Sequence, residues 1–217
     1  VAGVAVDGAA SAAPNWRVVD EFFTVRIRGR VTYTLRLIDA DHIELRLAGT
    51  GKRLTLELGG KAANIIFDDA ALDQAVEGIV NGIYFNQGHV CCAGSRLLVQ
   101  ESIYEPVIEK LKRRLTTLRV GDPLDKNTDV GAINSKQQLE KIEELVRSGE
   151  EEGADIYQPP CRLPEKGYWF VPTVFTNVAQ SYRIAQEEIF GPVLSVLTFR
   201  TPDEAVEKAN NTPYGLS

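Results

Sequence analysis

The stretch at residues 193–199 is the sequence feature that most constrains the fold. It reads Val-Leu-Ser-Val-Leu-Thr-Phe, a nearly continuous apolar run. Strands buried on both faces have this composition, and they are typical of parallel sheets covered by helices. From about residue 53 onward, short apolar stretches alternate with stretches of helical periodicity. This order predicts an α/β domain with a mostly parallel sheet and helices on both faces.

Helix starts can be predicted from residues whose side chains cap free backbone N–H groups. Asp68 or Asp69 precedes the first helical stretch, and we expect one of them to cap it. Three later helical stretches follow the cap-type residues Ser102, Ser135 and Thr201. Each of the three has Glu or Gln three residues further on, which is the pattern of a capping box.

Composition and charge exclude several classes of protein. The chain has 217 residues and a formal net charge of −6, so nothing attracts it generally to nucleic acid or to an acidic membrane. No apolar run approaches the roughly 20 residues that cross a bilayer, and residues 1–14 lack the cationic start of a signal peptide. The odd number of cysteines (Cys91, Cys92 and Cys161) favours free thiols in a reducing compartment. We expect a cytoplasmic protein with no nucleic-acid partner, no membrane partner and no metal site.

Residues 22–47 follow a different pattern, in which apolar residues alternate with Arg and Thr. This period of two predicts a short antiparallel meander. The arginines would form either a nucleic-acid-binding face or the solvated side of a small sheet. Interspersed acidic residues, and the lack of an aromatic stacking platform, favour the second interpretation. We expect a flexible tail over residues 1–20 and a short β-meander or rearranged segment over residues 21–50.

Two adjacent cysteines lie between a helical stretch and the strand predicted near residue 97, in the sequence Asn-Gln-Gly-His-Val-Cys-Cys-Ala-Gly-Ser-Arg at residues 86–96. Taken alone, such a pair is usually inert packing. Two further motifs change that interpretation: Leu-Glu-Leu-Gly-Gly-Lys at residues 56–61 and Glu-Glu-Ile-Phe-Gly-Pro at residues 187–192. Glu57 precedes Cys91 by 34 residues, and Glu188 follows Cys91 by 97. With these motifs and spacings, residues 53–217 resemble the catalytic domain of the aldehyde dehydrogenase superfamily.

The resemblance implies an oxidoreductase that converts an aldehyde to a carboxylic acid with NAD or NADP. Cys91 would be the nucleophile, forming a hemithioacetal and then a thioester. Glu57 would be the general base that activates water, and the backbone N–H of Cys91 would form half of the oxyanion site. The residues implied to contact the cofactor are Glu188 at the nicotinamide ribose, Phe190 at the nicotinamide ring, and Leu58, Gln138 and Lys141.

Simpler interpretations of the same residues stay open. Glu57 would then be a surface acid at a strand end, Glu188 a solvated helix residue and Phe190 part of the core. His89 stands where the family usually has Gln or Glu. It either alters the charge near Cys91 or changes little, and we favour the second. We expect Cys92 to pack behind the loop.

The resemblance also sets expectations for the whole chain. Residues 51–217 would be an aldehyde dehydrogenase-like catalytic domain truncated at its C-terminal end, and the family's nucleotide-binding domain has no recognisable counterpart before it. A small-molecule aldehyde would be the substrate, and full-length relatives would be homo-oligomers. Two alternatives remain: a residual thiol esterase, and a non-catalytic module that acts through interaction or assembly.

Overall fold

The computed structural model describes residues 3–5, 15–19, 22–27, 31–37, 43–47, 55–57 and 59–216, with side chains from residue 59 onward. The chain divides into two compact units. The first comprises residues 1–59 with 213–215, and the second comprises residues 60–212 with 216–217.

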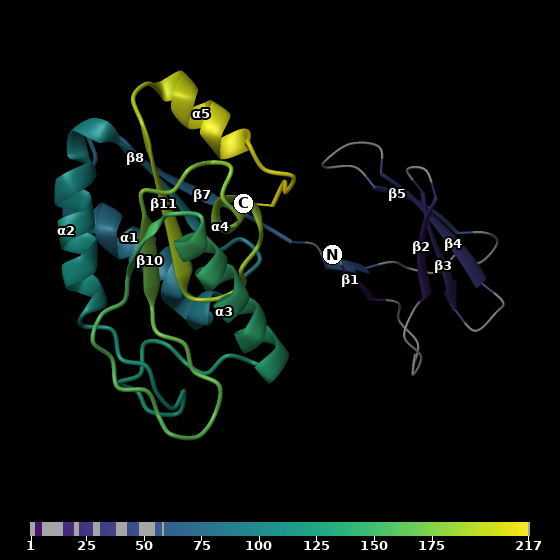
Figure 1. The fold of residues 1–217 in the computed structure, drawn as a ribbon, viewed down its shortest axis with the longest axis horizontal. Coiled ribbons are helices and arrows are strands. Elements are labelled where there is room, and N and C mark those ends of the chain that lie inside the picture. Colours follow the sequence, from purple (N-terminus) through teal and green to yellow (C-terminus); the bar gives the residue numbers. More distant parts are fainter. Residues whose placement is uncertain are drawn as a thin grey trace. The chain divides into compact units, whose positions relative to one another are not determined.

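The first unit is built from short antiparallel strands (Figure 1). One sheet has four strands in sequence order: β2 (Asn15–Val19), β3 (Phe22–Ile27), β4 (Val31–Leu37) and β5 (Ile43–Leu47). Separately, β1 (Gly3–Ala5) pairs with β6 (Thr55–Glu57). Strands β3 to β5 lie in the stretch whose alternation predicts strands. Much of the tail expected over residues 1–20 lies outside the described residues, and the proposed domain boundaries stay predictions.

The second unit contains a five-stranded sheet in the order β7-β8-β11-β10-β9 (Figure 1). Its strands are β7 (Ala63–Ile66), β8 (Arg96–Gln100), β9 (Asp155–Tyr157), β10 (Thr173–Thr176) and β11 (Val193–Phe199). The first four in that order are parallel, and only the edge strand β9 is antiparallel to its neighbour. The prediction of a mostly parallel α/β sheet is therefore confirmed.

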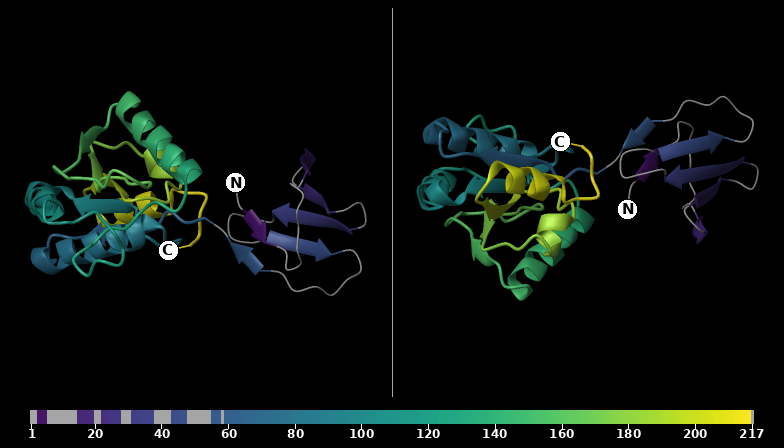
Figure 2. Two further views of the ribbon diagram at one scale, coloured as in Figure 1. Left: turned by 90° about the horizontal axis from the view of Figure 1, so that it is seen from below. Right: turned by 90° about the horizontal axis from the view of Figure 1, so that it is seen from above.

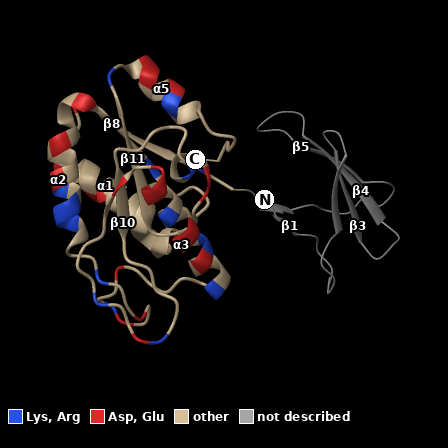
Figure 3. Cartoon of the chain, viewed as in Figure 1, with Lys and Arg blue, Asp and Glu red and all other residues tan. Residues whose placement is uncertain are grey.

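Helices cover both faces of this sheet (Figure 2). They are α1 (Leu72–Tyr84), α2 (Tyr104–Leu115), α3 (Lys136–Glu151), α4 (Arg183–Gln186) and α5 (Pro202–Asn210), with short 3-10 helices η1 (Phe85–Gly88) and η2 (Glu101–Ile103). Most charged residues of this unit lie on the helices and loops, and the central strands carry almost none (Figure 3). No helix in the described part of the chain is both long and apolar enough to cross a membrane.

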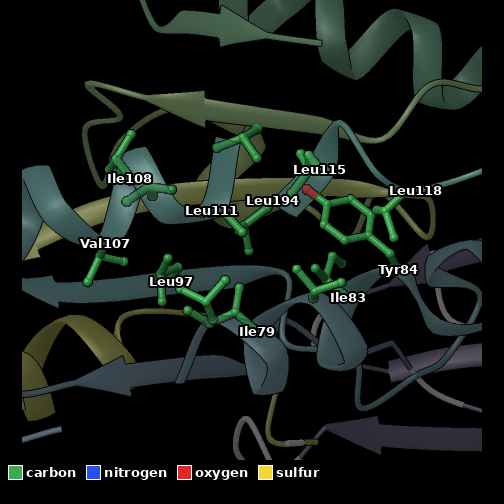
Figure 4. Close-up of a cluster of buried hydrophobic side chains, with 14 of the residues drawn as sticks. Ile79, Ile83, Tyr84, Leu97, Val107, Ile108, Leu111, Leu115, Leu118 and Leu194 are labelled. Carbon is green, nitrogen blue, oxygen red and sulfur yellow. The ribbon is translucent and has the colours of Figure 1, made fainter. Parts of the chain in front are cut away.

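The largest core lies between one sheet face and helices α1 and α2 (Figure 4). It is formed by Ile79, Ile83 and Tyr84 of α1, Leu111 and Leu115 of α2, and Leu97, Leu194 and Val196 of β8 and β11. Each fully buried aliphatic side chain of this kind contributes about 1.5–3 kcal/mol. This packing fixes the C-terminal end of α1, where the cysteine-bearing loop begins.

The opposite sheet face is covered by α3, α4 and α5. Leu98 follows Leu97 in β8 and points to this second face, where it packs with Leu197, Phe199 and Ala205. Another cluster joins β10 and β11 to α3 and α4. Because both faces are covered, these strands need apolar side chains at successive positions, as the sequence at residues 193–199 predicts.

The predicted helix caps are confirmed for two helices and wrong for two. Ser135 Oγ accepts the Gln138 N–H at 3.1 Å, and Thr201 accepts the Glu204 N–H at 3.3 Å. In contrast, no side chain caps α1, whose N-cap residue is Ala71, or α2, where η2 precedes the helix. Asp68 instead makes two hydrogen bonds with the Gln100 side chain. The Asp68 N–H donates to Gln100 Oε1, and the Asp68 carboxylate accepts from Gln100 Nε2.

Candidate active site

The loop that carries the cysteines reverses the chain through three consecutive left-handed residues. Asn86, Gln87 and Gly88 have φ values of 50°, 48° and 75°. Asn86 closes the turn, because its Nδ2 donates to the His89 carbonyl at 3.0 Å and its carbonyl accepts the His89 N–H at 2.9 Å. A fixed turn of this kind leaves Cys91 exposed at the surface.

Gly60 lies where three segments of the chain meet. A Cβ on this residue would be 2.0 Å from the carbonyl oxygen of Cys91 and 3.2 Å from that of Leu216, which pairs with Gly60 in a parallel bridge. The Gly60 N–H donates to Glu188 Oε1 at 2.9 Å. A glycine is therefore required at this position. Its backbone joins the cysteine loop to the segment that carries Glu188.

Two adjacent acids after α4 have different partners. Arg183 binds both carboxylate oxygens of Glu187, at 2.6 and 3.2 Å, and also reaches Glu144 of α3 at 3.1 Å. These hydrogen bonds hold the pKa of Glu187 below its usual range. Because Arg183 binds Glu187 on the side of α3, the next carboxylate, Glu188, is left to contact Gly60.

Gln138 supports the backbone of Phe190. Its Nε2 donates to the carbonyls of Ile189 at 2.9 Å and Phe190 at 3.1 Å. Phe190 has a φ of 55°, a left-handed conformation that is uncommon for a residue with a side chain. Gln138 also lines a surface cavity of about 390 Å³ at the start of α3, together with Lys141. Two of the residues predicted to contact a cofactor thus share one cavity.

The imidazole of His89 stacks on the Phe190 ring. The ring centroids are 5.1 Å apart and the planes differ by 4°. Next to this stack, Gly88 packs so closely on Gly191 that a Cβ would lie 2.2 Å from the Gly191 carbonyl oxygen. His89 is half-buried, and desolvation lowers its pKa. The cysteine loop and the Phe190 segment are thus in direct contact.

Lys61, next to Gly60, is 1% exposed, and its Nζ has no hydrogen-bond partner within the described residues. Desolvation lowers its pKa to about 7, and the charge of Arg96 adds to this effect, whereas Glu188 opposes it. Arg96 donates to the carbonyls of Lys61, Lys208 and Ala209, at distances from 2.7 to 3.0 Å. It therefore ties the segment after Gly60 to the end of α5.

The expectation that Cys92 packs behind the loop is wrong. Cys91 and Cys92 form one tight turn, and both are exposed, whereas Ala93 after them is buried. Cys161 is half-buried, and all three thiols are free. Within the described ranges, no group of His, Cys, Asp and Glu could hold a metal ion.

Known proteins are similar to the part of the chain that contains these segments. The family model described as "Aldehyde dehydrogenase family" matches residues 40–217. The chain belongs to the aldehyde dehydrogenase family. The match begins 13 residues before residue 53, where the resemblance stated above begins, so it includes part of the stretch expected to be a separate segment.

Individual aldehyde dehydrogenases are similar over about the same region. Retinal dehydrogenase 2 of Taeniopygia guttata is 52% identical over 165 residues, covering 76% of this chain and 32% of the relative. Among solved structures, an NAD-dependent aldehyde dehydrogenase from Sinorhizobium meliloti gives a TM-score of 0.72 at 47% identity, covering 75% and 33% of the two chains. Betaine aldehyde dehydrogenase from Staphylococcus aureus, in complex with NAD+, gives 0.69 at 43%, covering 72% and 32%. The chain spans about a third of the length of these relatives.

Within this aldehyde dehydrogenase chain, the structure brings several predicted site residues together. Gly60 contacts the Cys91 backbone and the Glu188 carboxylate, while Gln138 bonds to the backbone of Phe190. The backbone of Glu57 ends β6, but its side chain lies outside the described residues, as does Leu58. The roles assigned to all these residues stay predictions.

Three residues at the site carry no assigned role in the sequence analysis. Gly60 and Lys61 lie inside a quoted motif, and the Gly-Gly pair after a strand is the signal that could have indicated a close backbone approach. His89 is visible only as a departure from the family, and its partner Phe190 lies 101 residues away.

Proposed function

We propose that this chain forms the catalytic part of an enzyme that oxidises an aldehyde to a carboxylic acid, with Cys91 as the nucleophile. The observation that carries the proposal is the exposed Cys91 thiol on a turn whose backbone packs against Gly60. A fixed, accessible thiol is what attack on a carbonyl carbon requires. Family membership and the presence of all three motifs support the same chemistry.

In the first step, the Cys91 thiolate forms a C–S bond with the aldehyde carbon. The carbonyl oxygen becomes an oxyanion, which the backbone N–H of Cys91 stabilises. The hydride leaving this carbon would pass to a bound NAD, the chemistry that this cofactor would supply, and a thioester would remain on Cys91. Glu57 takes a proton from the water that attacks the thioester, the C–S bond breaks, and the carboxylic acid leaves.

The residues present fit a nicotinamide nucleotide. Glu188 offers a carboxylate for ribose hydroxyls and Phe190 offers a ring for the nicotinamide, while Gln138 and Lys141 line one cavity. Leu58 completes the proposed set. The similar structures from S. meliloti and S. aureus are described as NAD-dependent or bound to NAD+, which favours NAD over NADP.

The test of this proposal is NADH formation by the purified chain with a panel of aldehydes. The panel includes retinal and betaine aldehyde, because similar proteins are named for them. We expect Cys91→Ser to lower kcat/KM by at least about a thousandfold, since the nucleophile is lost.

Cys92→Ser is the matched control, because Cys92 is also exposed and adjacent in sequence. It should keep most of the activity. Loss of activity in Cys92→Ser with activity retained in Cys91→Ser would contradict the proposal. Absence of NADH formation by the unmodified chain with every aldehyde in the panel would contradict it too.

A further inference from the structure

We propose that His89 is a positioning residue whose imidazole holds the Phe190 ring in the orientation in which that ring meets the cofactor. This inference rests on the proposed function, because the proposed role of Phe190 is contact with the nicotinamide. His89 itself would touch neither the aldehyde nor the reacting atoms. It would act through the ring on which it stacks, 5.1 Å away and tilted by 4°.

The backbone of Phe190 is fixed independently of His89. Gln138 donates to the Phe190 carbonyl, and Gly191 packs against Ile142 so closely that a Cβ would lie 2.6 Å from its Cδ1 atom. These contacts hold the left-handed backbone conformation of Phe190. They leave the rotation of its side chain open, because neither touches the phenyl ring. The His89 stack touches the ring itself and can select one ring orientation.

His89 is itself held in place by the turn around it. Asn86 bonds to both the N–H and the carbonyl of His89, and Gly88 packs against the backbone of Gly191. The imidazole therefore projects from a fixed backbone toward the Phe190 segment. Because the two segments are packed directly on each other, a ring anchored to one can orient a ring on the other.

One nitrogen of the imidazole, Nε2, is also not committed to a hydrogen bond. This atom is buried and has no hydrogen-bond partner within the described residues. Burial lowers the pKa of His89, which disfavours the charged imidazolium. The interaction left to this side chain is the aromatic contact, which would shift the equilibrium between orientations of the Phe190 ring by about twofold to tenfold.

The first experiment observes the stack without requiring turnover. The chain contains two histidines, so His42→Gln leaves His89 as the sole source of imidazole proton signals in an NMR spectrum. We expect these signals to be shifted upfield by the Phe190 ring and to lose that shift in Phe190→Leu. Signals that stay unchanged in Phe190→Leu would overturn the proposal, provided the variant keeps the dispersed spectrum of a folded chain.

The second experiment compares His89→Gln, which removes the ring, with His89→Phe, which keeps a ring but cannot titrate. We expect His89→Gln to lower kcat/KM for NAD by about twofold to tenfold. His89→Phe should restore the value to within about twofold. All three proteins should alkylate Cys91 at the same rate, because the stack orients Phe190 and does not activate the thiol. Equal kcat/KM in all variants, or no rescue by Phe, would overturn the proposal.

The two measurements separate the failure of this inference from that of the proposed function. If the unmodified chain forms no NADH, the proposed function fails, and the positioning role fails with it even where NMR detects the stack. If turnover occurs but is insensitive to residue 89, the proposed function stands and the positioning role alone is wrong.

Discussion

The Gly60 N–H donates to Glu188 Oε1 at 2.9 Å, joining two residues separated by 128 positions in the chain. On its other side, Gly60 packs against the Cys91 carbonyl. A single glycine therefore sets the distance between the thiol-bearing turn and the segment with Glu188 and Phe190. The motifs meet because the backbone at this point carries no side chain.

Gly60→Ala should disturb both stability and the site. Its Cβ would lie 2.0 Å from a backbone oxygen, so the cysteine loop must shift. We expect a loss of about 1–3 kcal/mol in the free energy of unfolding, as for other overpacked sites. Cys91 alkylation should change rate as well. Urea denaturation and timed alkylation measure the two effects.

Gly78→Ala is the control for that substitution, because a Cβ at Gly78 of α1 meets nothing within 4 Å. It should leave alkylation unchanged and stabilise the helix by about 0.5–1 kcal/mol. If Gly60→Ala also leaves alkylation unchanged and does not lower the free energy of unfolding, the close contact between Gly60 and Cys91 is not what the site requires.

Lys61→Met should change how stability depends on pH. The pKa of Lys61 is lowered from 10.5 to about 7 in the folded chain, chiefly by desolvation. Between these two values the unfolded chain binds a proton that the folded chain has released, so the free energy of unfolding rises with pH. The slope from this group reaches about 1.4 kcal/mol per pH unit, and Lys61→Met removes it.

Urea denaturation of both proteins from about pH 6 to about pH 10 measures this difference. We expect Lys61→Met to be the more stable protein near pH 6 and to lose its advantage as the pH rises through the window. Exposed Lys126→Met serves as the control and should leave the pH profile unchanged. Parallel curves for wild type and Lys61→Met would show that Lys61 stays charged in the folded chain.

Tyr84→Phe should weaken the packing of α1 against the sheet. The buried Tyr84 hydroxyl donates to the Thr173 carbonyl at 3.0 Å, and burial raises its pKa far above the usual value. Removing the hydroxyl leaves this carbonyl without that donor, which costs about 1–3 kcal/mol. Exposed Tyr168→Phe is the control, and equal unfolding midpoints for both variants would contradict this account.

Local sequence patterns predicted much of the fold. The apolar run of β11 indicated a strand covered on both faces, and Ser135 and Thr201 marked helix starts that the structure confirms. The missed cap at α1 has a long-range cause. Asp68 is engaged by Gln100, 32 residues away, and no local pattern predicts that pairing.

The motifs predicted a set of candidate residues, but not the contacts between them. The motifs gave Cys91 and Glu188 without indicating that Gly60 joins them. The His89–Phe190 stack depends on how two distant loops pack, and a periodicity argument contains no such information. Lys61 escaped notice because lysine is almost always exposed, whereas here it is buried.

The most direct test of the central claim is to label the chain with a limiting amount of a thiol reagent and to map the modified cysteine by mass spectrometry. Cys91 and Cys92 are both exposed, so exposure alone predicts comparable labelling of the two. If Cys91 is the nucleophile, it should take most of the label, ahead of Cys92 and Cys161. Labelling that is equal at Cys91 and Cys92, or faster at Cys92, would contradict the assignment of Cys91.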